Sequence, residues 1–123
     1  MTNFLKGFLY AFNGLSVFFR RERNGRIQLV ISIVIAMLAW WLRVSAFEWI
    51  ILLACIATVL SFEMINSAIE KLCNLVHPEY HAAVKVIKDI SAGAVLWASV
   101  FSGIIGFIIF LPKIIYFFYH IGT

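Results

Sequence analysis

The sequence predicts an all-α membrane protein in which three membrane-spanning helices follow an amphipathic surface helix. Of its 123 residues, 63% are hydrophobic and 13% are charged, whereas soluble domains are nearer half apolar and a quarter charged. The mean hydropathy is +0.99, and the apolar residues gather in three long stretches, each approaching the ~20 residues that a helix needs to cross a bilayer. We expect a single domain over residues 1–123, because the chain is too short for more.

Residues 1–20 form the predicted surface helix. Its apolar residues recur at steps of three and four, as on one face of a helix: Phe4, Phe8, Phe12, Leu15 and Phe19. Polar residues gather on the opposite side, and this pattern is typical of a helix that lies in the membrane interface. A signal peptide is the competing interpretation. We reject it because the arginines follow the apolar part and no small-residue cleavage site is evident.

The first two spans are predicted over residues 27–43 and 48–75. An arginine-rich hinge, RRERNGR at residues 20–26, precedes the first span and predicts a cytoplasmic anchor, because lysine and arginine gather on that side of a membrane. The turn between the spans carries little positive charge and is expected outside. We therefore interpret the formal charge of +4 as a sign of topology and expect no nucleic-acid partner.

The third span is predicted over residues 90–111. Pro78 ends the second helix, because proline lacks a backbone donor and biases the preceding residue away from helical geometry, and Pro112 is expected to close the third span. Small residues recur in this span at every fourth position: Ala94, Ala98, Ser102 and Gly106. Such spacing lets helix backbones approach closely in lipid, so we expect a bundle completed by other copies of the chain. The N-terminus is expected inside and the C-terminus outside.

A polar stripe interrupts the second predicted span. Glu63, Asn66, Glu70 and Asn74 share one face of a helix, because steps of three and four return to the same side. A carboxylate that faced lipid would cost a few kcal/mol or more. Glu63 is therefore expected to face a protein interior or a wet cavity and to be functional. The alternative is a structural stripe that holds helices together.

The charged residues suit phosphoryl transfer. Glu22, Glu63 and Glu70 are expected near the cytoplasmic ends of two spans, and Lys88 and Asp89 open the third at the same depth. Carboxylates bind Mg²⁺, a positioned carboxylate can take a proton from a hydroxyl, and a lysine supplies charge to phosphate oxygens. The sequence has no GxxxxGK[ST] loop, no HRD or DFG set and no GxGxxG. Nucleotide chemistry here therefore requires a different architecture.

The segment FEMINSAIEKLCNLVHPEYHAAVKVIKDISAGAVL resembles the small integral-membrane diacylglycerol kinases of bacteria and their undecaprenol kinase relatives. The pattern E-x-x-N-S/T-A-I-E matches at Glu63–Glu70, and K-D followed by small residues matches at Lys88 and Asp89. Glu22 in RRERNGRI also matches, so the resemblance covers nearly the whole chain. Asn74 departs from the pattern, because the family commonly has Asp there. The resemblance implies an ATP-dependent lipid kinase of the bacterial cytoplasmic membrane that uses Mg²⁺ and assembles as a homotrimer.

The resemblance also implies roles for individual residues. Glu63 resembles the general base that activates the lipid hydroxyl, and Glu22 and Glu70 resemble the metal-binding acids. Asn66 is expected to position groups beside them, and Trp41 is expected near the lipid. A larger set is expected to contact ATP: Tyr10, Glu22, Glu70, Glu79, Tyr80, His81, Lys88 and Asp89.

Several alternatives remain at this point. The ERN hinge and the Ala92–Ala94 segment resemble the undecaprenol kinase branch, so the acceptor is either undecaprenol or diacylglycerol. A small oligomeric transporter could use Glu63 alone to exchange protons, and for a noncatalytic adaptor the acids would be dispensable. His77 and His81 could pair on a metal only if a helix held both, and Pro78 between them argues against that.

Overall fold

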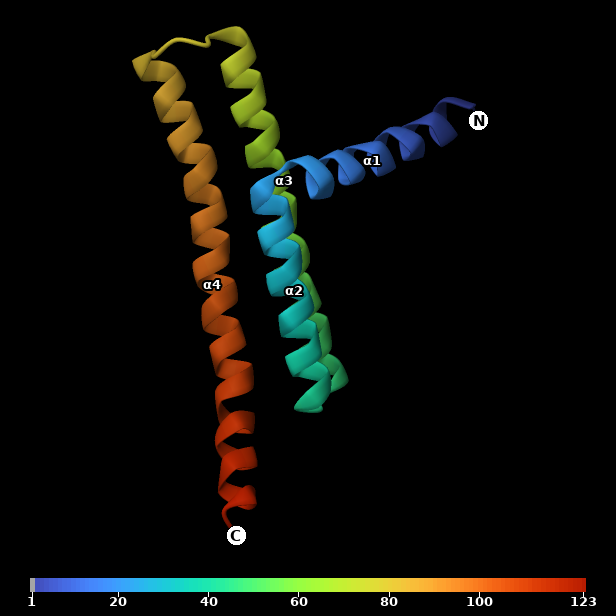
Figure 1. Ribbon diagram of the computed structural model, residues 1–123, viewed down its shortest axis with the longest axis vertical. Coiled ribbons are helices and arrows are strands. Elements are labelled where there is room, and N and C mark those ends of the chain that lie inside the picture. Colours follow the sequence, from blue (N-terminus) through green and yellow to red (C-terminus); the bar gives the residue numbers. More distant parts are fainter. Residues whose placement is uncertain (1) are drawn as a thin grey trace.

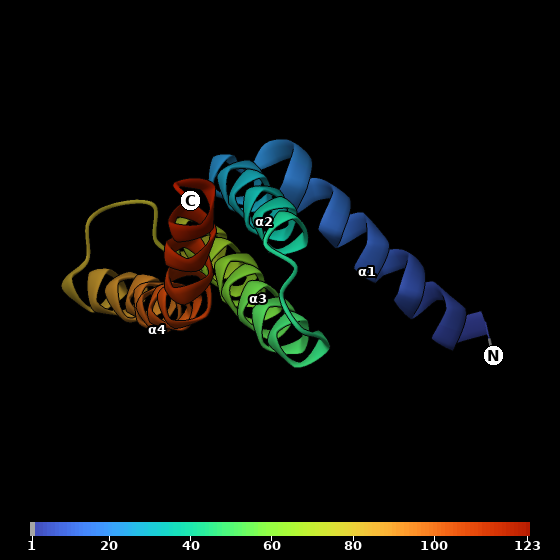
Figure 2. The same ribbon diagram turned by 90° about the horizontal axis from the view of Figure 1, so that it is seen from below.

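A computed structural model describes residues 2–123, and within them the chain folds into four helices (Figure 1). Their order is α1 (Thr2–Arg21), α2 (Arg23–Trp41), α3 (Ala46–Val76) and α4 (Ala82–Ile121). The helices α2, α3 and α4 are each long and apolar enough to cross a membrane, which confirms the prediction of an all-α chain with three such helices. In the view along the bundle α3 lies between α2 and α4, and α1 extends away from all three (Figure 2).

A sharp corner joins α1 to α2. The break between them is the single residue Glu22, whose backbone is extended, with φ −92° and ψ 123°. Gly25 allows the close approach that follows: a Cβ there would meet the carbonyl oxygen of Phe18 at 2.7 Å and its ring at 3.0 Å. Because glycine has no Cβ, α2 can begin directly against the last turn of α1.

The α2–α3 turn is closed by local hydrogen bonds. The backbone N–H groups of Arg43 and Val44 donate to the carbonyl oxygens of Trp40 and Ala39, at 3.3 and 3.2 Å, in the pattern of a Schellman helix end. Ser45 then caps α3: its hydroxyl accepts from the N–H of Glu48 at 3.1 Å, and the Glu48 carboxylate accepts from the N–H of Ser45 at 3.0 Å. This reciprocal capping box fixes where α3 begins.

The fourth helix corrects one prediction. Pro112 was expected to close the third span at residue 111, but α4 begins at Ala82 and continues through Pro112 to Ile121. A proline removes one helical hydrogen bond and bends the helix without having to end it, particularly in apolar helices whose neighbours compensate. Figure 2 shows the last part of α4 turning toward α2. There the Phe117 ring packs edge-on against the Trp41 ring, with 4.6 Å between the ring centroids.

The two ends of the bundle differ in what they bury. We call the end that carries residues 42–45 the turn end, and the end that carries residues 77–81 the loop end. The buried apolar cluster lies at the turn end: Ala39, Val44, Leu52, Ile109 and Phe110. The buried polar side chains lie farther toward the loop end: Glu63, Asn66, Ser67 and Ser91. The site is therefore sought in the loop-end half.

Candidate active site

The polar face of α3 is the centre of the candidate site. Glu63 and Asn66 are only 7% and 5% exposed, although both lie in a helix long and apolar enough to cross a membrane. One turn farther on, the Asn66 amide nitrogen donates to the Glu70 carboxylate at 3.5 Å. The structure therefore brings Asn66 and Glu70 together on the face that the helical period predicts, with Glu63 one turn deeper.

The other end of the Asn66 side chain has no partner. Its Oδ1 atom is buried and accepts no hydrogen bond from any of residues 2–123. Buried polar atoms are nearly always paired, and leaving one unpaired costs about 1–3 kcal/mol. An oxygen left in this state is suited to a donor or cation that arrives with a substrate.

The donor chemistry fits Mg²⁺ that is bound together with phosphate. Glu22, Glu70 and the Asn66 Oδ1 atom offer hard oxygen ligands, which Mg²⁺ prefers. Among residues 2–123 no group of three or more His, Cys, Asp or Glu side chains is placed to hold a metal alone. Mg²⁺ is commonly held by one or two carboxylates plus the phosphates of its substrate. The residues present fit that mode rather than an all-protein cage.

Glu22 is directed at the same helix by an ion pair. Its carboxylate makes no capping bond to α2 and instead contacts the Lys71 ammonium of α3 at 2.5 Å. Lys71 directly follows Glu70, so the pair joins the α1–α2 corner to α3 at the height of Glu70. Our sequence reasoning missed Lys71. The available signal was that Lys71 is the one basic residue within Ala46–Val76.

Gln28 connects the carboxylate to a cavity between the helices. Its side chain comes from α2 and lies beside Glu63, and it also lines a cavity of about 430 Å³ between α2, α3 and α4. The remaining walls are mostly apolar, with the hydroxyls of Ser32, Ser99 and Ser102 among them. Sequence reasoning missed Gln28 too, although it is one of only two polar residues in the apolar stretch 27–42. A mostly apolar cavity with a polar residue, Gln28, that also lies beside a buried carboxylate suits a lipid alcohol.

At the loop end, Lys88 and Asp89 are engaged with different partners. The Lys88 ammonium donates to the Asn74 side-chain oxygen at 2.5 Å, joining α4 to α3. Asp89 instead pairs with Lys85 at 2.6 Å, one turn earlier on α4. The Lys88–Asn74 contact puts Lys88 on the side of α4 that faces α3, at the end of the polar stripe.

The α3–α4 loop itself is held by its histidines. His81 accepts from the N–H of Ala83 at 3.1 Å and so caps α4. The His77 ring hydrogen-bonds the carbonyl oxygen of Glu79 at 3.0 Å. The ring centroids of His77 and His81 lie 4.9 Å apart. Glu79 and Tyr80 are exposed, Tyr80 to 80%, so this loop offers accessible polar and aromatic groups.

Two of the predicted site residues lie elsewhere in a single copy of the chain. Tyr10 is 71% exposed on α1, which extends away from the other helices (Figure 1). Trp41 is at the turn end, where it packs against Phe117. A rise of about 1.5 Å per residue puts Glu63 about 25 Å along α3 from Ala46, which follows that turn. One copy of the chain thus separates both aromatic residues from the polar face of α3.

Comparison with known proteins gives a consistent result. Residues 9–110 match the family model for prokaryotic diacylglycerol kinase. The chain is 34% identical over 114 residues to the undecaprenol kinase of Bacillus subtilis (strain 168), and the alignment covers 93% of each chain. It is 33% identical over 114 residues to a diacylglycerol kinase of Synechocystis, covering 92% of this chain and 65% of that one. It is 31% identical over 97 residues to the diacylglycerol kinase of Escherichia coli (strain K12), covering 79% and 80%.

Proposed function

The chain belongs to the prokaryotic diacylglycerol kinase family and is an ATP-dependent lipid kinase, and we propose that Glu63 is its general base. Glu63 accepts the proton of the lipid hydroxyl, whose oxygen forms a bond to the γ-phosphorus of ATP. The bond from that phosphorus to the bridging oxygen breaks, and ADP leaves. The observation that carries this assignment is a carboxylate only 7% exposed, next to Gln28, a residue that lines an apolar cavity.

The rival functions account for fewer of these groups. A proton-exchanging transporter needs Glu63 alone, and neither the family match nor the named relatives support it. A noncatalytic adaptor gives no reason for the unpaired Asn66 oxygen beside Glu70. A kinase uses all of them, because it must hold a base, a cation and phosphate oxygens at one boundary.

The proposed metal ligands are Glu22 and Glu70, with Asn66 positioned between Glu63 and Glu70. When bound, Mg²⁺ neutralises charge on the phosphates. Support comes from the hydrogen bond of Asn66 to Glu70 and from the ion pair that directs Glu22 to Lys71 on α3. The Lys71 ammonium places a positive charge beside Glu22.

The proposed ATP-contacting set consists of polar and aromatic groups, most of them exposed: Tyr10, Glu22, Glu70, Glu79, Tyr80, His81, Lys88 and Asp89. Tyr10 and Glu22 come from α1 and the α1–α2 corner, and the others come from the loop-end parts of α3 and α4 and the loop between them. Lys88 is the group best suited to phosphate oxygens, since an ammonium interacts with them as a point charge. Its present acceptor is a neutral amide, Asn74, so phosphate can compete for it.

A homotrimer is proposed because one copy leaves the site incomplete. Tyr10 lies on a helix that extends away from the bundle (Figure 1), so it can approach ATP most directly from a neighbouring subunit. Large apolar side chains also remain exposed on all three long helices, for example Met37, Ile65 and Trp97 at 54–70%. Lipid and neighbouring helices together can cover such faces.

The loop end is proposed to face the cytoplasm. The arginines of the α1–α2 corner lie on that side of the membrane under the positive-inside rule. α1 is then an interfacial helix, in keeping with its exposed apolar side chains Phe4, Phe8 and Phe12. The N-terminus is inside and the C-terminus outside, and the site lies where ATP from the cytoplasm meets lipid from the bilayer.

The proposed acceptor is a polyprenol, with diacylglycerol used less well. The relative named undecaprenol kinase matches over 93% of both chains, and the cavity that Gln28 lines is mostly apolar. The test is kcat/KM for undecaprenol and for a dioleoyl diacylglycerol in the same mixed micelles, because specificity is the ratio of these constants. A tenfold preference for diacylglycerol, about 1.4 kcal/mol, would overturn the polyprenol assignment. Loss of ATP turnover with both lipids in Glu63→Gln is expected and tests the general base independently.

A further inference from the structure

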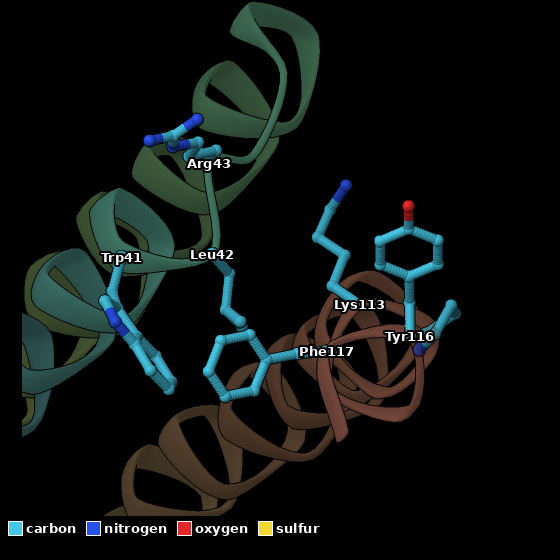
Figure 3. A pocket seen from close by; sticks show the side chains of 7 residues that line it. Trp41, Leu42, Arg43, Lys113, Tyr116 and Phe117 are labelled. Atoms are coloured by element: carbon cyan, nitrogen blue, oxygen red, sulfur yellow. The ribbon is translucent and has the colours of Figure 1, made fainter. Parts of the chain in front are cut away.

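A second pocket lies at the turn end, remote from the kinase site. It encloses about 660 Å³, and Figure 3 shows the side chains that line it: Trp41, Leu42, Arg43, Pro112, Lys113, Tyr116 and Phe117. Four of these belong to the part of α4 that begins at Pro112. Residues 112–117 also lie beyond residue 110, where the match to the family ends. The pocket is therefore built partly by a segment that the kinase chemistry does not explain.

The pocket has one polar edge and one aromatic edge. In Figure 3 the polar ends of Arg43, Lys113 and Tyr116 lie along one side, and the rings of Trp41 and Phe117 lie on the other. Those two rings pack edge-on at 4.6 Å, so the aromatic wall is fixed. A ligand that filled this pocket would present a polar group to two cations and a hydroxyl, and an apolar portion to the rings.

The charge at the polar edge is positive. Lys113 is held by the Glu48 carboxylate at 3.0 Å, and Glu48 is itself fixed by the capping box with Ser45. Within residues 2–123 Arg43 takes part in no ion pair. Two cations and one carboxylate leave one net positive charge, centred on Arg43. Arginine presents a planar fork that matches two oxygens of a phosphate.

Arg43 also occupies an unusual backbone position. Its φ is 54°, in the left-handed region, at the helix-end position where glycine is usual. Holding a residue with a side chain there is destabilising, and such positions gather at ligand sites. The chain thus keeps a cation where glycine would be more stable, at the rim of a pocket with no acidic group of its own.

We propose that this pocket binds the phosphate headgroup of an anionic phospholipid from the leaflet at the turn end. Arginine and lysine pair with phosphate oxygens through charge-assisted hydrogen bonds, and Trp and Tyr side chains favour the headgroup depth of the membrane. A soluble phosphate ester shares the phosphate chemistry. The aromatic wall favours the lipid, because it offers an apolar surface to the glycerol and the upper acyl chains.

The test measures phosphatidylglycerol retained by the purified protein in phosphatidylcholine nanodiscs, by native mass spectrometry. Arg43→Gln is expected to weaken retention about tenfold, the loss of one charge-assisted pair, and Arg43→Lys to keep part of it. Arg43→Gly is the informative variant, because it should raise the melting temperature by relieving the left-handed backbone and still lose the lipid. Lys6→Gln removes the same charge on α1 and should leave retention unchanged.

Three results would overturn the proposal. Equal losses in Arg43→Gln and Lys6→Gln would mean that general surface charge, not the pocket, holds the lipid. Unchanged retention in an Arg43→Gln/Lys113→Gln double variant would mean that the pocket binds no phosphate. Displacement of the lipid by an equal concentration of glycerol 3-phosphate would assign the pocket to a soluble ester. Kinase activity is not the readout, so the outcome is separate from that of the lipid-kinase assignment.

Discussion

The turn end and the loop end of the bundle are built on opposite principles. At the turn end, buried residues are apolar, the helix ends are capped, and Lys113 is paired with Glu48; a local rule is broken there at Arg43, whose left-handed backbone lies at the second pocket. At the loop end, Glu63 and Asn66 are buried in an apolar helix, and one Asn66 oxygen has no partner. Features that break local rules gather at functional sites, and the rest of the fold compensates for them. The turn end supplies the stability that lets the loop end keep a polar site.

Helix length explains how one chain produces both ends. α2 has 19 residues, whereas α3 has 31 and α4 has 40. α2 begins at the Glu22 corner, which lies partway along α3. Beyond this corner only α3 and α4 continue toward the loop end (Figure 1). Three helices pack together at the turn end, and only two remain beyond the corner. Beyond the corner the loop-end half of α3 and α4 is open to a substrate or a neighbouring subunit, whereas Glu63 and Asn66 stay buried.

The largest effect is expected from Glu63→Gln, which alters the loop end alone. The amide keeps the size of the side chain but cannot accept the hydroxyl proton, so kcat should fall by about 10²–10⁴. ATP binding and thermal stability should persist, because the turn-end core is untouched. Turnover of lipid alcohol is followed by ADP release in mixed micelles, with ATP affinity measured separately.

Thr58→Val is the matched control for that variant. Thr58 lies on the same helix and donates only to the carbonyl oxygen of Ala54, so its loss should leave kcat close to that of the wild type. A Glu63→Gln enzyme that turned over as fast as the wild type would remove Glu63 from the mechanism and leave the polar stripe a structural feature.

The next effect is expected at the turn end, from Leu52→Ala. Leu52 is 3% exposed within the apolar cluster. Truncating such a residue lowers the free energy of unfolding by about 2–5 kcal/mol in soluble proteins. In a membrane the separated helices are still surrounded by apolar lipid, so mainly the loss of packing contacts lowers the stability. We expect a loss of about 2 kcal/mol and a lower melting temperature by circular dichroism in micelles. Because Leu52 also lines the cavity between α2, α3 and α4, the KM for lipid can change, but kcat of the folded fraction at saturating lipid should not.

Leu53→Ala provides the comparison, because Leu53 is 53% exposed and loses the same atoms without opening a cavity. If Leu52→Ala lowered kcat at saturating lipid and at temperatures where the protein is fully folded, packing at the turn end would affect catalysis at the loop end. The assignment of stability to one end and catalysis to the other would then be wrong.

The sequence predicted the turn end and the loop end unequally well. Hydropathy and helical period were enough for the three long helices and for the shared face of Glu63, Asn66 and Glu70, because these depend on local spacing. Contacts between helices were not predictable in this way. The contact of Lys71 with Glu22 and that of Gln28 with Glu63 depend on how α2 lies against α3, which the sequence pattern does not show. Pro112 was wrongly expected to end a helix. An apolar helix can accommodate a proline by bending, so a proline there does not by itself mark a helix end.

Gly25→Ala tests the corner where the two regions join. Alanine favours a helix over glycine by about 1 kcal/mol, but its Cβ would meet the Phe18 carbonyl oxygen at 2.7 Å. Overpacking of this kind costs about 1–3 kcal/mol, so we expect a net loss of about 1 kcal/mol and a displaced Glu22. The Mg²⁺ concentration that gives half-maximal activity should rise.

Gly7→Ala is the control for the corner, because a Cβ at Gly7 meets nothing within 4 Å. It should gain helix propensity without cost and leave the Mg²⁺ requirement unchanged. A Gly25→Ala protein with the Mg²⁺ dependence of the wild type would show that the position of Glu22 does not depend on the corner.

The smallest effect is expected from Asn74→Asp, which restores the residue that the family resemblance leads one to expect. The Lys88 ammonium donates to a neutral amide oxygen at 2.5 Å, and a carboxylate there would hold it by charge as well. Both side chains are exposed, so the gain is at most about 0.5–1 kcal/mol. Because Lys88 is proposed to contact phosphate, a tighter pair should raise the KM for ATP by about twofold to fivefold at low salt, a range that this energy implies.

High salt screens exposed charges and should remove the difference in KM. Asn13→Asp, with the same added charge on α1, should show no difference in KM at either salt concentration. A KM that fell in Asn74→Asp would mean that the carboxylate orients Lys88 toward ATP rather than competing for it. The interhelical contact at the loop end would then prepare the site instead of occupying it.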